Sequence, residues 1–319
     1  MNYKERLSQI QEIEDINLKK QLIFYLQTSA YTYLGPYTEF VQKLPDDLKK
    51  LCTLQRMQTI HAKEFFDNKN IRKDKNNANG DMTKIPVDRM NNEEDIFQTA
   101  INIFAELLRR NSKYTVNRKA KDKINLVCRG YALMLASTLK AKFIPARVRV
   151  GFAKYHEKNI YDDQWNVEYY DLEQKRWIMV DVTSLGSENK VKDYALDIPK
   201  NQFITAAEAW KNIRSNKFKE KEKIVDTGGY EGIKAAWLQL MNDFSCLMNN
   251  ERSFLFQPSY MYECKDNYYY IRDFTDKELI ELDELADLML ENDNNLDKLY
   301  KLYNSETKYR KLLGLSTWN

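Results

Sequence analysis

The apolar residues of this chain repeat with a helical period at both ends and alternate in the middle, and this change constrains the fold most. Residues 3–29 carry apolar side chains three and four positions apart, and segments after residue 186 do the same. Residues 147–153, 164–170 and 176–182 instead alternate apolar and polar side chains, which is typical of strands. The pattern predicts an α+β fold, in which a helix packs on a small antiparallel sheet and extensive helices flank this core at both ends.

The composition favours long helices and a sizeable core. The chain has 319 residues, of which 43% are hydrophobic, and only 9 Gly and 6 Pro. We therefore expect a single domain over residues 1–319. Within it, residues 1–110 form an N-terminal helical part, residues 111–185 the core, and residues 186–319 a C-terminal helical part.

Charge and hydropathy exclude several classes of partner. Lys and Arg total 50 against 47 Asp and Glu, and the resulting net charge of +3 does not indicate a nucleic-acid-binding protein. A membrane helix needs a run of about 18 apolar residues, and the sequence has none. The N-terminus lacks the pattern of a secretory leader, so we expect a cytoplasmic protein that binds neither nucleic acid nor membrane. The oligomeric state cannot be inferred from this sequence.

The four cysteines are spread along the chain without a CxxC pair, and there are only two histidines. This spacing argues against a disulfide framework and against a metal site, so no metal or other cofactor is expected. Cys128 differs from the others because it opens a predicted helix over residues 128–142. Backbone N–H groups and the helix dipole at such a position favour the nucleophilic thiolate. The alternative is a small buried hydrophobic residue, as free cysteine usually is, and we assign that role to the other three.

Four short segments follow one another in a characteristic order, beginning at Cys128. They are residues 128–132 (CRGYA), 144–152 (IPARVRVGF), 163–169 (DQWNVEY) and 176–181 (RWIMVD). In this order they resemble the transglutaminase-like superfamily, a papain-like group of cysteine enzymes, over about residues 125–185. The flanking helices are similar to those of bacterial transglutaminase-like proteins of unassigned function. The resemblance implies a papain/transglutaminase-like core that acts on peptide or protein amides.

The resemblance also implies a Cys–His–Asp triad, from which this chain departs at one position. Cys128 takes the place of the nucleophile and Asp181 that of the acid that orients the imidazole. The position of the histidine is occupied by Gln164. An amide cannot accept the thiol proton or deliver one to a leaving amine, so the usual general base is missing.

Either histidine could substitute for the missing base. His156 precedes a predicted hairpin turn and lies about 7 Å further along the strand than Lys154, the residue expected opposite Gln164. This is too far for a direct hydrogen bond to the thiol. His61 is predicted on a helix that begins after Asp47, where a core histidine is the alternative. Trp165 and Tyr131 are expected to pack the helix on the sheet and to line a substrate cleft.

Other charged residues have simpler interpretations. Arg147 and Arg149 share one strand face and are expected to face solvent, with an anion-binding pair as the alternative. Glu168 is expected to orient a neighbour in the sheet. A further helix is predicted to start at Asn92 and Glu93.

Three functions remain open at this point. The first is acyl transfer or amide hydrolysis through a thioester on Cys128, with a substitute base. The second is a pseudoenzyme whose cleft binds a peptide or protein partner. The third is a helical interaction scaffold without a pocket at Cys128.

Overall fold

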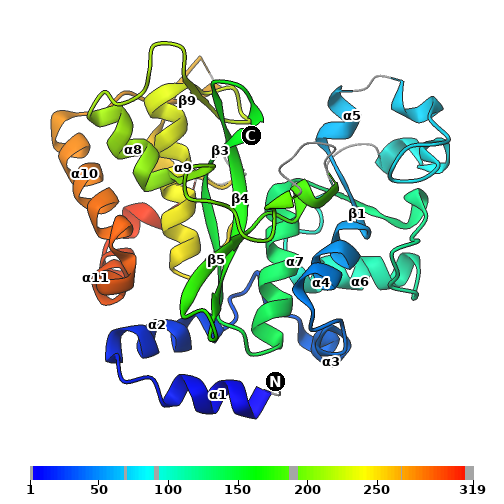
Figure 1. Cartoon of the computed structure of the whole chain (residues 1–319). Helices are drawn as coiled ribbons and strands as arrows, with labels where there is room; N and C mark the ends of the chain where they lie inside the picture. The colour runs from blue at the N-terminus through cyan, green and yellow to red at the C-terminus, as the bar shows by residue number, and fades with distance from the viewer. Residues whose placement is uncertain (1–2, 68–69, 90–92, 187–192, 267, 313–319) are drawn as a thin grey trace. The chain divides into compact units, whose positions relative to one another are not determined.

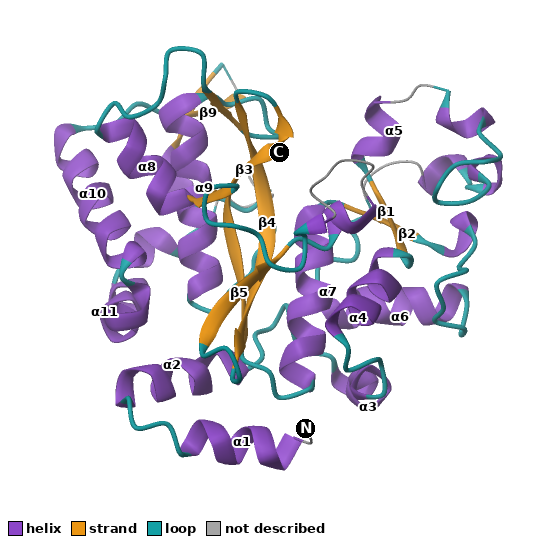
Figure 2. Ribbon diagram, viewed as in Figure 1, coloured by secondary structure: helices purple, strands orange, loops and turns teal. Residues whose placement is uncertain are grey.

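The computed structural model describes all residues except 1–2, 68–69, 90–92, 187–192, 267 and 313–319. Helices and strands both contribute (Figure 2), which confirms the predicted mixed α+β class. The chain divides into two compact units. Unit 1 comprises Met1–Ile10, Tyr25–Val148 and Trp165–Ile198, and unit 2 comprises Gln11–Phe24, Arg149–Gln164 and Pro199–Asn319. The single domain with boundaries at residues 110 and 185 stays a prediction.

Unit 1 is built around helix α7 (Cys128–Ala141), which is buried along almost its whole length. Helices α3, α4 and α6 pack against it (Figure 1). The helices that lie wholly or mainly in this unit are α1 (Tyr3–Gln11), α3 (Thr38–Gln42), α4 (Leu48–Arg56), α5 (Lys63–Asp67) and α6 (Ala100–Arg110). Asp47 caps α4 by accepting the N–H of Lys50 at 2.8 Å, as its sequence predicts.

A short parallel ribbon leads into α7. Strands β1 (Thr59–His61) and β2 (Ile124–Leu126) pair with His61 opposite Leu126. The N–H of Ala62 extends the ladder to the carbonyl of Leu126 at 2.9 Å. Because β2 ends only two residues before Cys128, this pairing carries His61 to the start of α7. His61 therefore lies in a strand, and its predicted place on a helix face was wrong.

Two long strands, β3 (Ala146–Glu157) and β4 (Ile160–Asp171), run through both units. In unit 1, β4 pairs antiparallel with β5 (Arg176–Val180), with Val167 opposite Val180. In unit 2, β3 pairs with β6 (Phe203–Thr205) and β4 with β7 (Lys223–Val225). The order of the main strands is β5-β4-β3-β6, so the alternating segments of the sequence form the predicted antiparallel sheet.

Unit 2 is mainly helical. Helix α8 (Ala206–Arg214) packs against α9 (Gly232–Leu247) and α10 (Asp276–Leu290), as Figure 1 shows. The predicted capping box of Thr275 and Glu278 opens α10, and a second one opens α8. The remaining elements are α2 (Ile16–Leu26), α11 (Asn292–Ser305), β8 (Tyr262–Lys265) and β9 (Tyr268–Ile271).

The helix predicted to begin near residue 92 starts later. Asn92 lies outside the described residues, Glu93 to Phe97 form turns, and α6 begins at Ala100 with Thr99 as its N-cap. Glu93 and Glu94 bond to β2 and to the start of α7 instead of opening a helix. None of the described helices is both long enough and apolar enough to cross a bilayer.

Candidate active site

Cys128 is the first residue of α7, and its side chain forms no disulfide and is half-buried. The chain reaches it in an extended conformation, because Val127 has φ −96° and ψ 177°. Cys52 and Cys246 are buried and Cys264 is exposed, away from any comparable helix start. Burial raises the pKa of the Cys52 thiol, which leaves that residue inert near neutral pH.

The amino end of α7 is already occupied by a carboxylate. Glu94 Oε2 accepts the N–H of Val127 at 3.2 Å and the N–H of Gly130 at 3.1 Å. These two N–H groups are therefore already paired with Glu94 and do not stabilise a thiolate, contrary to the expectation for the start of this helix. Gly130 is needed for the close approach, since a Cβ there would lie 2.9 Å from Leu126 and 3.0 Å from Glu94 Oε2.

Arg129 balances the charge of that carboxylate. Its Nη1 lies 2.8 Å from Glu94 Oε1, and the two side chains are 0% and 1% exposed. Burial raises the pKa of the Glu94 carboxyl, while the Arg129 guanidinium opposes this shift. The contact of Glu94 with the start of α7 was not predicted from the sequence. The available signal was a charged residue, Arg129, at the start of an otherwise buried helix, because a buried guanidinium requires a partner.

His61 lies near the start of α7, because its strand partner Leu126 precedes Cys128 by two residues. Its ring stacks on that of Tyr131, with centroids 6.0 Å apart and planes 26° apart. Tyr131 follows Cys128 by three residues, so the two side chains share one face of α7. His61 Nδ1 also accepts a long bond of 3.3 Å from the N–H of Lys63. Of the two histidines, His61 is thus the one that unit 1 brings to the start of α7.

Arg56, at the end of α4, contacts both Tyr131 and the turn that holds Asp181. Its guanidinium lies 5.7 Å from the centre of the Tyr131 ring, and its Nε donates to the carbonyl of Thr183 at 3.4 Å. The N–H of Thr183 in turn donates to Asp181 Oδ1 at 2.9 Å. The sequence analysis did not single out Arg56, because its partners are far away along the chain.

Asp181 is buried and caps the short turn that follows β5. Besides Thr183, Ser184 donates to it through its N–H at 3.1 Å and its hydroxyl at 2.7 Å. These bonds fix the orientation of the carboxylate. The residue therefore has a structural role in the turn, in addition to the predicted role in orienting a base.

The other predicted site residues have the following places. Gln164 is buried in β4 and belongs to unit 2. His156, also in unit 2, lies at the end of β3 with its Nδ1 3.3 Å from Asp162 Oδ2. Trp165 and Tyr131, in unit 1, are each 2% exposed, which agrees with packing; their contact with substrate stays a prediction. Across the described residues, no cluster of three His, Cys, Asp or Glu side chains is arranged to hold a metal.

Arg147 and Arg149 are buried, so the prediction that they face solvent was wrong. In unit 1, Arg147 Nε lies 2.8 Å from Glu168 Oε2, and its guanidinium lies 4.0 Å from the centre of the Trp177 ring. Glu168 thus orients a neighbour in the sheet, as predicted. In unit 2, Arg149 makes two bonds to Asp243, at 3.0 and 2.9 Å. Each arginine therefore has a structural role as one partner of a buried ion pair.

Comparisons with known proteins assign no role to the residues described above. No protein family model matches the chain, and no curated protein matches it. Among solved structures, it is similar to a "Putative Cysteine Protease from Cytophaga hutchinsonii", with 15% identity and a TM-score of 0.34. That match covers 61% of this chain and 47% of the other, so this chain spans less than half of its neighbour. A TM-score this low does not establish a shared fold.

Proposed function

We propose that unit 1 catalyses cysteine-dependent acyl transfer or amide hydrolysis, with Cys128 as the nucleophile and His61 as the general base. The observation that carries this proposal is the stacking of His61 on Tyr131, one helical turn after Cys128. The motif order that resembles the transglutaminase-like superfamily, with its papain-like core, supports the same chemistry. The substrate class is a peptide or protein amide, and the setting is the cytoplasm of a bacterium.

The proposed reaction follows from these roles. The thiol proton moves to the imidazole as sulfur attacks the carbonyl carbon, and a tetrahedral oxyanion forms. The C–N bond then breaks, and the leaving amine takes the proton from the imidazolium. Water or a second amine attacks the thioester and restores the thiol. Because the long bond from Lys63 to His61 Nδ1 is weak, this nitrogen can exchange it for the thiol proton.

The capping carboxylate limits how the oxyanion is stabilised. The N–H groups of Val127 and Gly130 already donate to Glu94, so stabilisation has to come from other donors and from the helix dipole. Arg56 supplies a positive charge over the ring of Tyr131. In this proposal, Asp181 positions the substrate or the attacking water.

A pseudoenzyme is the second candidate. Gln164 occupies the position where the resemblance places the histidine, and a buried carboxylate sits at the helix end where a thiolate would be favoured. In this case the cleft keeps its shape and binds a peptide or protein partner without turnover. The scaffold without a pocket at Cys128 has no specific observation in its favour.

The test compares the two histidines in the full-length protein. Thioester formation on Cys128 is measured by intact mass after reaction with activated esters and with glutamine-containing peptides. We expect Cys128→Ala to abolish the adduct and His61→Phe, which keeps an aromatic ring for stacking, to slow it by about 100-fold or more. His156→Phe is the matched control and should change the rate less than twofold.

Two outcomes would contradict the enzymatic proposal. If wild-type protein forms no adduct with any of these substrates, the pseudoenzyme is favoured. If His156→Phe slows the reaction and His61→Phe does not, the assignment of the base is wrong. Thermal unfolding of each variant distinguishes loss of the base from loss of the fold.

A further inference from the structure

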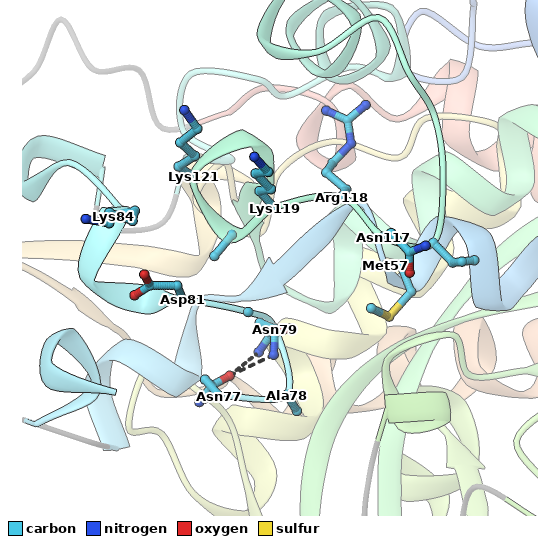
Figure 3. Close-up of a pocket in the computed structure, with 13 residues that line it drawn as sticks. Met57, Asn77, Ala78, Asn79, Asp81, Lys84, Asn117, Arg118, Lys119 and Lys121 are labelled. Carbon is cyan, nitrogen blue, oxygen red and sulfur yellow. Dashed lines mark hydrogen bonds between the residues drawn. The ribbon is translucent and has the colours of Figure 1, made fainter. Parts of the chain in front are cut away.

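Unit 1 contains a pocket of about 690 Å³ that none of the proposed catalytic residues lines. Figure 3 shows its walls, which come from the end of α4, from residues 77–84 and from residues 116–121. Four cationic residues, Lys84, Arg118, Lys119 and Lys121, and one acidic residue, Asp81, line it. We propose that this pocket binds acidic side chains of the peptide whose amide is presented to Cys128. This proposal rests on the proposed function.

The acidic residue of the pocket is bonded within its own turn. Asp81 Oδ1 accepts the N–H of Thr83 at 3.0 Å and its hydroxyl at 2.6 Å. These bonds, with a contribution from the charge of Lys84, hold the pKa of the Asp81 carboxyl below its usual range. The carboxylate thus caps a backbone turn, and the surrounding cations outnumber it.

Arg118 contributes charge from within the wall. It is buried, and its guanidinium donates to the side chain of Gln58 at 2.6 Å and to the carbonyls of Leu107, Asp122, Asn111 and Lys113. All of these acceptors are neutral, so the bonds fix the guanidinium without cancelling its charge. Lys84, Lys119 and Lys121, labelled in Figure 3, are exposed lining residues, and their flexible ammonium groups can follow a carboxylate.

The pocket is joined to the candidate active site by one arginine. Asn79, in the pocket wall, accepts a bond from Arg56 Nη1 at 3.4 Å. The same guanidinium lies over Tyr131, which stacks on His61. A bound acidic side chain would therefore lie within a few side chains of the nucleophile. This proximity favours an acidic segment of a peptide substrate over an unrelated anion.

The test measures binding by fluorescence anisotropy with labelled hexapeptides of glutamate and of glutamine. The protein is the full chain, used both as wild type and as Cys128→Ala. We expect the hexaglutamate to bind at least tenfold more tightly than the hexaglutamine at low salt. Charge reversal by Lys119→Glu with Lys121→Glu should weaken this binding at least tenfold. Lys49→Glu, an exposed lysine of α4 outside the pocket, should change it less than twofold.

The outcomes separate this proposal from the proposed function. Equal binding of the two peptides, which needs no variant, overturns the acidic-peptide site, as does binding that the double reversal leaves intact. A single-stranded oligonucleotide of equal charge that binds more tightly, and is lost in the same variant, overturns it in favour of nucleic acid. Retained binding in Cys128→Ala supports the pocket even if no acyl chemistry is found. Acyl chemistry without selective binding would refute the pocket alone.

Discussion

Each of the two units buries an arginine–carboxylate pair and holds a further ionisable group with a shifted pKa, and the further groups have opposite charge types. In unit 1, Arg129 pairs with Glu94, and the further group is the amine of Lys123. In unit 2, Arg149 pairs with Asp243, and the further group is the carboxyl of Asp163. The two units should therefore respond in opposite directions to a change of pH.

The two pairs also hold different kinds of structure. Asp243 lies within α9 and accepts the N–H of Val150 as well as the Arg149 guanidinium, so it ties a helix to a strand. Glu94 lies in an irregular segment and bonds to the amino end of α7, so it ties a loop to the helix that presents Cys128. The same chemistry thus stabilises the fold in unit 2 and positions the candidate nucleophile in unit 1.

The largest expected effect comes from removing either buried carboxylate. Glu94→Ala and Asp243→Ala should each lower the free energy of unfolding by about 3–5 kcal/mol, because a buried guanidinium loses its counter-charge. Urea denaturation measures this loss. Equal losses of unfolding free energy would support the view that both units bury an arginine–carboxylate pair. A loss below about 1 kcal/mol for either variant would show that its pair is not buried as described.

Alkylation of Cys128 by iodoacetamide distinguishes the two variants. Glu94→Ala should raise the rate about two- to fivefold, because the helix end gains N–H groups and loses a negative charge. Asp243→Ala should leave the rate unchanged under native conditions. Glu94→Gln, which keeps one acceptor oxygen, covers the case in which the alanine variant does not fold. An unchanged rate in both Glu94 variants would contradict the role of this carboxylate at the thiol.

Lys123→Met should stabilise the protein. The Lys123 side chain is 0% exposed, and its Nζ has no hydrogen-bond partner in the described part of the chain. Burial, with the nearby charges of Arg56 and Arg118, lowers the pKa of this amine to about 8. Relative to an ordinary lysine this costs about 3 kcal/mol at neutral pH, which methionine would recover in part. Lys121→Met, an exposed control, should change the stability by less than about 0.5 kcal/mol.

The pH dependence tests the same lysine independently. Because its pKa is lower in the folded state, the stability of the wild type should rise between about pH 8 and pH 10.5. The difference between wild type and Lys123→Met should shrink over this range. A constant difference would mean that the amine has an ordinary pKa and a solvated environment.

The sequence predicts well those features that depend on neighbours along the chain. The start of α7 at Cys128, the Asp47 cap and the Thr275–Glu278 capping box are all local patterns. Features that depend on distant partners were missed or wrong. The charge of Glu94 suggested a helix start, and its burial follows from Arg129, thirty-five residues later.

The placement of the histidines shows the same limit. His61 continues an apolar helical period, but its pairing with Leu126 makes it a strand residue beside the cysteine. Arg147 and Arg149 alternate as solvent-facing residues would, and only the positions of Glu168 and Asp243 explain their burial. The spacing of apolar residues along the chain predicted the class of fold, whereas the surroundings of Cys128 are set by contacts between distant segments.

Asp163 gives the smallest expected effect, because this side chain keeps some exposure to solvent. Its carboxylate accepts the N–H of Thr227 at 2.8 Å and the hydroxyl of Thr227 at 2.7 Å. Burial, reinforced by the charges of Asp162 and Asp226, raises the pKa of Asp163 to about 7. A carboxyl with a raised pKa in the folded state stabilises below its unfolded pKa near 3.8, and this contribution is lost as the pH rises to about 7.

Asp163→Asn should therefore make the protein more stable than the wild type at pH 8 and remove this part of the pH dependence. An asparagine keeps the oxygen that accepts from Thr227, so the turn is preserved. Thermal unfolding between pH 4 and pH 8 measures the effect, with Glu284→Gln, an exposed carboxyl of α10, as the control. If the two proteins differ by the same amount at every pH, Asp163 is ionised throughout. In that case the contrast between an excess amine in unit 1 and an excess carboxyl in unit 2 would be lost.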